Sequence, residues 1–204
     1  MEQLLAPAPS KGRPREFCLD AALAGALRVF WRYGYEGASM AELTAEMGIT
    51  KPSLYAAFGN KEALFHKALD LYEREKLAYM STALDAPTAR GVAERLLHGA
   101  LEMQMKPGDP KGCLGVISAN ACGVEAESIK AEVVKRRASS EAALVARFER
   151  ARDEGDLPDT ITPQALVRYL FALMQGLMIQ AGSGATPAQL SELVETSLAL
   201  WPTR

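Results

Sequence analysis

Cysteine and histidine are scarce in this chain. Its 204 residues contain two histidines and three cysteines, Cys18, Cys113 and Cys122. Three unevenly spaced cysteines cannot build a disulfide framework, and Cys113 with Cys122 supplies no complete set of metal ligands. The motifs H-E-x-x-H, G-x-S-x-G and G-x-G-x-x-G are absent. We therefore expect no metal, no cofactor and no enzymatic activity.

Long apolar runs are also lacking. No uninterrupted apolar stretch reaches the roughly 18 residues of a membrane-spanning helix. The first ten residues, MEQLLAPAPS, have no basic start followed by an apolar core, as an export signal would. We expect a cytoplasmic protein without a membrane partner. The net charge of −2 excludes a protein that coats nucleic acid by bulk charge, but it leaves room for a local basic patch.

Helical periodicity runs through the chain, and no alternating strand pattern interrupts it. Serine, threonine or asparagine precedes most of the expected starts, as N-cap residues do, and Thr162-Pro163 and Thr186-Pro187 add proline at the first helical position. The pattern predicts about nine helices. The first ends at Gly34, and the others cover 40–47, 51–58, 61 toward 84, 88 to about 105, 113–122, about 126–154, and the stretches after 162 and 186. The fold class is therefore expected to be all-α.

The most informative segment lies between Ser39 and Phe58. A capping box, Ser39-Met-Ala-Glu42, opens a short helix that stops at Gly48, and Thr50 caps the next short helix. Two brief helices joined by a glycine-containing turn are typical of the helix-turn-helix. Its second helix enters the DNA major groove while the first helix braces it. The segment therefore predicts a DNA-binding surface.

A longer set of spacings resembles the DNA-binding domain of the tetracycline-repressor (TetR) family. The residues that carry it run as Ala26-Leu27-x-x-Phe30-x-x-x-Gly34-Tyr35-x-x-x-Ser39-Met40-x-x-Leu43-x-x-x-Met47-Gly48-Ile49-Thr50-Lys51-Pro52-Ser53-Leu54-Tyr55-x-x-Phe58-x-x-Lys61-Glu62-x-Leu64-Phe65. One departure is Thr44, where the family more often has alanine. The resemblance implies a flexible basic arm over 1–15, a three-helix helix-turn-helix domain over 16–62, and a larger helical ligand-binding and dimerisation domain over 63–204.

The same resemblance implies a homodimer whose last two helices form a four-helix bundle with the partner. Bulky and small residues in the last two expected helices suit such an interface, and the candidates are Leu166, Tyr169, Leu173, Gly176, Leu177, Leu190, Val194, Leu198 and Trp201. Two-fold symmetry predicts a palindromic double-stranded operator with half-sites about 34–36 Å apart.

Nine residues are candidates for contact with DNA. Lys51 can donate to a guanine edge, and Tyr55 resembles the family tyrosine that binds a phosphate. Ser39 and Lys61 stand at helix starts, where free amides attract phosphate; Thr50, Ser39 and Pro52 are also explained by capping or by a helix start. Arginines in the arm can enter a minor groove or remain solvated. The full set is Arg13, Arg15, Ser39, Thr50, Lys51, Pro52, Ser53, Tyr55 and Lys61.

Apolar residues in the second domain can line a cavity for a small-molecule effector or simply form the core. The candidates are Met103, Cys113, Ile117, Phe148, Phe171, Met174 and Met178. Cys113 follows Lys111-Gly112 at an expected helix start, where a lysine and free amides can make a thiol reactive.

The helix-turn-helix pattern predicts DNA binding, and the resemblance to the TetR family implies a repressor that a small-molecule effector releases. Three alternatives remain open: a thiol-based redox or electrophile sensor acting through Cys113, a small-molecule enzyme, and a helical adaptor without DNA activity.

Overall fold

The computed structural model describes the backbone of residues 15–121, 123 and 126–202. Within these residues the chain forms ten α-helices and no strands, which confirms the all-α prediction. The helices are α1 Arg15–Gly37, α2 Met40–Met47, α3 Lys51–Phe58, α4 Lys61–Lys76, α5 Ala78–Ala83, α6 Ala89–Met105, α7 Leu114–Ala121, α8 Glu127–Asp153, α9 Pro163–Gly182 and α10 Pro187–Ala199. Arg13 and Cys122 lie outside the described residues, and so do the side chains of Arg15 and Cys18.

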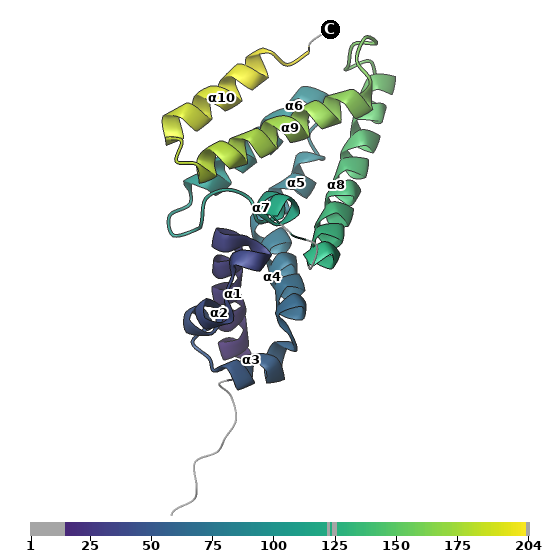
Figure 1. Ribbon diagram of the computed structural model, residues 1–204. Coiled ribbons are helices and arrows are strands. Elements are labelled where there is room, and N and C mark those ends of the chain that lie inside the picture. Colours follow the sequence, from purple (N-terminus) through teal and green to yellow (C-terminus); the bar gives the residue numbers. More distant parts are fainter. Residues whose placement is uncertain (1–14, 122, 124–125, 203–204) are drawn as a thin grey trace, which may run out of the picture.

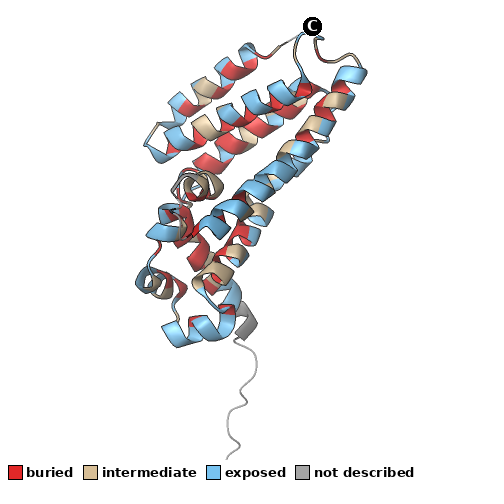
Figure 2. Ribbon diagram, turned by 45° about the vertical axis from the view of Figure 1, so that its right-hand side comes forward, coloured by how far each residue is buried: buried red, intermediate tan, exposed pale blue. Residues whose placement is uncertain are grey.

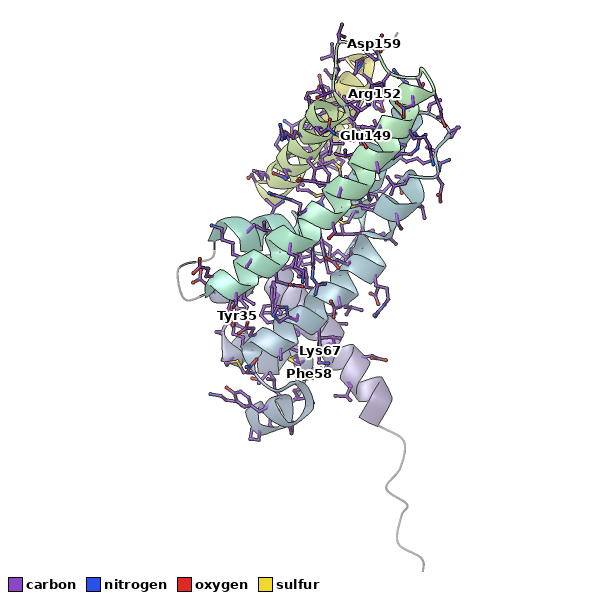
Figure 3. The ribbon with its side chains drawn as sticks, turned by 90° about the vertical axis from the view of Figure 1, so that its right-hand side faces the viewer. Tyr35, Phe58, Lys67, Glu149, Arg152 and Asp159 are labelled. Atoms are coloured by element: carbon purple, nitrogen blue, oxygen red, sulfur yellow. The ribbon has the colours of Figure 1, made fainter. Side chains whose placement is uncertain are left out.

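The molecule is elongated, with α1, α2 and α3 at one end (Figure 1). Helix α4 leads from this end into the second part, where α9 and α10 lie side by side and α8 runs along one flank. Buried residues face neighbouring helices, and exposed residues cover the outer side of α8 (Figure 2). Phe58, at the end of α3, and Asp159, after α8, lie toward opposite ends of the molecule (Figure 3).

The predicted N-caps confirm the helix starts. The side chains of Ser39, Thr50 and Asn60 accept backbone N–H groups in the first turns of α2, α3 and α4. Thr162 and Thr186 do the same for α9 and α10, each with proline at the following position. These hydrogen bonds satisfy amides that have no partner inside the helix.

Helix boundaries differ from the prediction at two places. The helix expected to end at Gly34 is kinked there (φ 71°, ψ −177°), and α1 continues to Gly37. The helix expected from 61 toward 84 is broken at Leu77, whose backbone (φ −105°, ψ 8°) separates α4 from α5. The break lets α5 pack on α6, where the Tyr79 ring lies so close to Gly99 that any side chain there would collide with it. No glycine or proline marks the bend, so the tertiary contact overrides an unbroken apolar pattern.

Aromatic contacts join α1 to α4. The Phe30 and Phe65 rings meet edge to face with centroids 5.1 Å apart, and Tyr35 contacts Phe65 in the same way at 5.4 Å. Further along, the Trp31 and Tyr72 rings meet at 4.8 Å. Such edge-to-face pairs stabilise a core beyond the apolar area they bury. Helix α4 is therefore fixed to the first part of the molecule along much of its length.

Within the described residues, α9 is long and apolar enough to cross a membrane by length and composition alone. Nine of its side chains are buried in this protein, and the helix packs against α6, α8 and α10. One side of the helix therefore belongs to the core of this protein, and Arg168 interrupts its apolar sequence.

Candidate nucleic-acid interface

Helices α2 and α3 form the predicted helix-turn-helix. Gly48 ends α2 in the left-handed conformation (φ 65°), which glycine adopts without strain. Thr50 then caps α3, whose Leu54 and Phe58 are buried against the rest of the domain. With its apolar side anchored in this way, α3 presents its opposite side to solvent.

Helix α1 braces α2 through a close approach and an ion pair. A Cβ atom added at Gly25 would lie 2.7 Å from the carbonyl oxygen of Glu46, which is closer than real Cβ contacts. One turn further, Arg28 Nε donates to Glu46 Oε1 at 2.8 Å. The sequence analysis did not single out Gly25 or Arg28, although a glycine inside an apolar helical stripe is a signal of close packing.

The predicted contact residues of α3 lie together on its exposed side. Lys51, Pro52, Ser53 and Tyr55 are all exposed, and 45% of the Tyr55 surface is accessible. The Lys51 ammonium lies 6.0 Å from the centre of the Tyr55 ring, and it forms no ion pair with any described residue. A free cation, a phenol and a hydroxyl thus share one surface that can donate to phosphates and base edges.

Two of the candidates are also engaged within the protein. The Thr50 hydroxyl lies 2.9 Å from that of Ser53 and accepts the Ser53 N–H, so it holds the start of α3. The Ser39 hydroxyl accepts the Glu42 N–H at 3.1 Å, and the Glu42 carboxylate accepts the Ser39 N–H at 3.0 Å, completing the predicted capping box. Both residues are exposed, so capping leaves them accessible to a ligand.

Lys61, at the start of α4, is half-buried. Its ammonium lies 4.7 Å from the centre of the Tyr35 ring, a cation–π distance. Burial lowers the pKa of Lys61, and the nearby Glu36 carboxylate opposes that shift. The Tyr35 ring therefore holds the Lys61 ammonium near the N-terminus of α4.

A cavity of about 710 Å³ lies in the second part of the molecule, bounded by α4 to α9. This volume falls in the range of ligand pockets in proteins. Four of the seven predicted ligand residues line it: Cys113, Phe171, Met174 and Met178. Met103 and Phe148 are buried in the core and Ile117 is half-buried, and none of these three residues belongs to the cavity lining.

Sequence reasoning missed Tyr72 and Tyr79, and from α8 it named Phe148 and not Val133 or Leu144, which line the cavity. Tyr79 lies two residues after the bend at Leu77, which no glycine or proline marks in the sequence. Among the described residues, no three His, Cys, Asp or Glu side chains come together to hold a metal ion.

The surroundings of Cys113 do not favour the thiol-sensor alternative. The Lys111 ammonium, which was expected to activate the thiol, donates instead to the carbonyl oxygens of Gln104 and Lys106. Cys113 itself lines the cavity beside Tyr72, whose pKa its proximity helps to raise.

The predicted dimer residues separate into two groups. Tyr169, Leu173 and Gly176 lie at the surface of α9. The other six are buried inside the chain, where they form the core beneath that surface: Leu166, Leu177, Leu190, Val194, Leu198 and Trp201. Periodicity identified the apolar side of each helix but could not distinguish the side facing its own subunit. The structure adds Ile179 and Leu200, exposed by 54% and 71%, to the accessible apolar residues of this region.

Comparison with known proteins agrees with this geometry. Residues 22–68 match the family described as bacterial regulatory proteins, tetR family. The chain is 30% identical over 195 residues to the HTH-type transcriptional repressor ComR of Escherichia coli K12, covering 95% of this chain and 93% of ComR. It is 28% identical over 196 residues to the repressor BdcR of the same organism, covering 92% and 94% of the two chains.

The fold also matches solved structures. A cysteine mutant of the TetR family transcriptional regulator CifR, complexed with 26 bp double-strand operator DNA, is 38% identical to this chain. That match covers 93% of this chain and all of the CifR chain, with a TM-score of 0.85. Similarity to ComR and CifR over nearly their full lengths, together with the helix-turn-helix of α2 and α3, shows that the chain belongs to the TetR family of bacterial transcriptional regulators.

Proposed function

We propose that this protein is a cytoplasmic transcriptional repressor that binds a palindromic operator as a homodimer and is released by a small-molecule effector. The observation that carries the proposal is the exposed polar side of α3, where Lys51, Ser53 and Tyr55 stand on a helix anchored by Leu54 and Phe58. The operator-bound structure of CifR and the repressor names of ComR and BdcR support it.

In this proposal, α3 is the recognition helix. Lys51 donates to a base edge, and Tyr55 donates its phenolic hydrogen to a backbone phosphate. The N-termini of α2 and α4, with exposed Ser39 and half-buried Lys61, hold phosphates on either side because free amides and the helix dipole attract anions. Pro52 contributes apolar contact with a thymine methyl, and Arg13 in the basic arm reaches a minor groove. The arm was predicted to include Arg15, but Arg15 is the first residue of α1, so it would contact DNA from the start of that helix.

The outer side of α9 is the proposed dimer interface. Tyr169, Leu173, Gly176 and Ile179 follow one another at steps of three and four residues, so they share one side of the helix. A Cβ atom at Gly176 would contact nothing in this chain, which leaves room for a partner helix. Ile179→Glu should therefore yield a monomer in sedimentation experiments, and an unchanged dimer would contradict this interface.

The cavity between α4 and α9 is the proposed effector site. Helix α4 contributes to its wall and also packs against α1, so a ligand there acts on an element shared with the DNA-binding end. Effector and operator must weaken each other's binding by the same factor if they favour different arrangements of this element.

The test of DNA binding uses the full chain and a labelled fragment of the DNA upstream of its own coding region, in an electrophoretic shift assay. Lys51→Ala should weaken binding by about 1–3 kcal/mol if the lysine reads a base, and Tyr55→Phe should weaken it through the lost phosphate contact. The matched control is Lys135→Ala, an exposed lysine on α8. Binding should also fall steeply with added salt, because phosphate contacts release counterions.

Equal binding by wild type and Lys51→Ala would remove the proposed role of Lys51. Failure of the wild-type dimer to retard the upstream DNA at low salt would contradict operator binding as a whole.

A further inference from the structure

A small polar cluster lies in the wall of the largely apolar cavity. It consists of the hydroxyl groups of Tyr72 and Tyr79 and the thiol of Cys113, and we call it the phenol–thiol cluster. Its members come from α4, α5 and the residue before α7. Much of the surrounding lining is hydrocarbon or thioether, including Leu69, Leu77, Leu84, Leu96, Val133, Leu144, Phe171, Met174 and Met178.

Within this cluster, the Tyr72 hydroxyl already has a partner. It donates to the sulfur of Met103 at 3.8 Å, and Cys113 and the Leu114 N–H lie near enough to influence its pKa. Burial, followed by the proximity of Cys113, raises the pKa of Tyr72 well above its ordinary value. Tyr72 is therefore a neutral group whose hydroxyl hydrogen is already donated within the protein.

The Tyr79 hydroxyl differs because it is fully buried and has no hydrogen-bond partner among the described residues. Two other buried side-chain atoms share that property in the described part of the chain, on Ser118 and Arg147, but neither residue lines the cavity. A buried hydroxyl without a partner is unfavourable. A ligand that supplies an acceptor here would remove that penalty.

The position and protonation of Tyr79 suit a donor. Its ring packs directly on Gly99 of α6, which limits its movement. Burial, followed by the electrostatic influence of Cys113, raises the pKa of Tyr79 above its ordinary value. At neutral pH the phenol is therefore protonated and can donate to an acceptor in the cavity.

Charged residues occur only along the α4 and α8 side of the lining, and each has an opposite charge nearby. Arg136 binds Glu73 at 2.9 Å as well as Asp70 and Glu132, while Arg74 pairs with Glu75 and Arg137 with Glu141. None of the described residues thus offers an unpaired charge to a ligand in the cavity. Burying an ion without a counter-charge is strongly unfavourable.

From these observations we propose that the effector is an uncharged, largely apolar molecule with one hydrogen-bond acceptor, such as a carbonyl oxygen, which the Tyr79 hydroxyl binds. The inference rests on the proposed function, because it takes the cavity as the effector site. It assigns Tyr79 as the group that selects for an acceptor, whereas the apolar wall selects for hydrocarbon surface.

Three naphthalene probes of similar shape separate these features. They are 2-acetylnaphthalene, which has a carbonyl acceptor, 2-ethylnaphthalene, which has none, and 2-naphthoate, which is charged. Calorimetric titration of the full chain without DNA should show the ketone binding about three- to tenfold more tightly than the hydrocarbon, as one hydrogen bond provides. Naphthoate should not bind at concentrations that saturate the ketone.

The decisive variant is Tyr79→Phe, which keeps the ring and removes the hydroxyl. It should reduce the ketone affinity to that of 2-ethylnaphthalene and leave the hydrocarbon affinity unchanged. Its midpoint of thermal unfolding should equal or exceed that of wild type, because an unpaired buried hydroxyl is lost. The matched control is Tyr33→Phe, which alters an exposed tyrosine on α1 and should change neither affinity.

Several results would overturn the proposal: a ketone that does not bind, equal binding of ketone and hydrocarbon, binding of naphthoate as tight as that of the ketone, or a Tyr79→Phe variant that keeps the preference for the ketone. Operator binding is measured separately on the same protein. Intact operator binding without a ketone preference would reject the effector class alone, whereas loss of operator binding with a ketone preference would reject the repressor function alone.

Discussion

The indole N–H of Trp31 donates a hydrogen bond of 3.1 Å to the carbonyl oxygen of Gly112, 81 residues further along the chain. Gln104 holds the same residue from the other side, accepting the Gly112 N–H at 2.8 Å and donating to its carbonyl oxygen at 3.1 Å. Gly112 needs its left-handed φ of 88° for this arrangement. Because Cys113 follows directly and faces the cavity, these bonds connect α1 to the cavity wall.

Trp31→Phe should therefore destabilise the protein more than Trp201→Phe. Both tryptophans are buried, but the Trp201 indole N–H has no hydrogen bond to the described residues. The Trp201 ring contacts that of Phe148, with the ring centroids 6.1 Å apart. Both substitutions lose packing volume, and only the first also loses a hydrogen bond, so the difference should be about 1 kcal/mol in the free energy of unfolding. Urea unfolding of the two variants measures it, and equal losses would contradict a stabilising role for the Trp31 bond.

Gly25→Ala should disturb the packing of α1 on α2. The added methyl group would meet the carbonyl of Glu46, a backbone atom that cannot move without shifting α2. We expect a loss of about 1–3 kcal/mol in the free energy of unfolding and weaker operator binding, since α2 braces α3. The control is Gly115→Ala in α7, where the added methyl group meets only ordinary contacts, 3.7 Å or more away. If Gly25→Ala had the same free energy of unfolding as wild type, α1 and α2 could move apart at no cost.

Much of the fold was predictable because its signals are local. Capping residues such as Ser39, Thr50 and Thr162 fix helix starts through hydrogen bonds within three residues. The break at Leu77 was not predictable, because it depends on Tyr79 packing against Gly99 of another helix. Local chemistry thus determines where these helices begin, while distant contacts determine where one of them bends.

The candidate DNA-binding surface was easier to predict than the cavity for a related reason. Its exposed residues come from one short segment around Lys51 and Tyr55 with recognisable spacing. The cavity instead combines six helices, and only a three-dimensional arrangement brings Tyr72 and Tyr79 beside Cys113. Likewise, periodicity predicted an apolar side for Leu166 and Leu190 without distinguishing the core from a dimer surface.

Arg136→Met should weaken the link between α4 and α8. The guanidinium binds Asp70 and Glu73 on α4 at 2.6 and 2.9 Å and Glu132 on its own helix at 2.7 Å, so its removal leaves three carboxylates close together. We expect a loss of about 1–2 kcal/mol in the free energy of unfolding, reduced by added salt, which screens the remaining repulsion.

The matched control for Arg136→Met is Arg137→Met. This neighbouring arginine has a single ion pair, with Glu141 four residues ahead at 3.3 Å, and such exposed pairs contribute less than about 0.5 kcal/mol. Chemical denaturation at low and high salt compares the two variants. Equal losses in the free energy of unfolding for the two substitutions would mean that the ion pairs of Arg136 with the α4 carboxylates do not stabilise the fold.

Glu42 gives the stability of α2 a defined pH dependence. Hydrogen bonds from the side chain and then the backbone of Ser39 lower the pKa of Glu42 below its ordinary value of 4.5. Because the folded-state pKa is the lower one, the ionised carboxylate stabilises the fold above about pH 4.5, and this contribution is lost as the pH falls through the folded-state pKa. Glu42→Gln keeps an acceptor for the Ser39 N–H but cannot ionise. The stability advantage of wild type over Glu42→Gln in urea unfolding should therefore be greater at pH 7 than at pH 3, and an advantage independent of pH would show that the capping box does not act through charge.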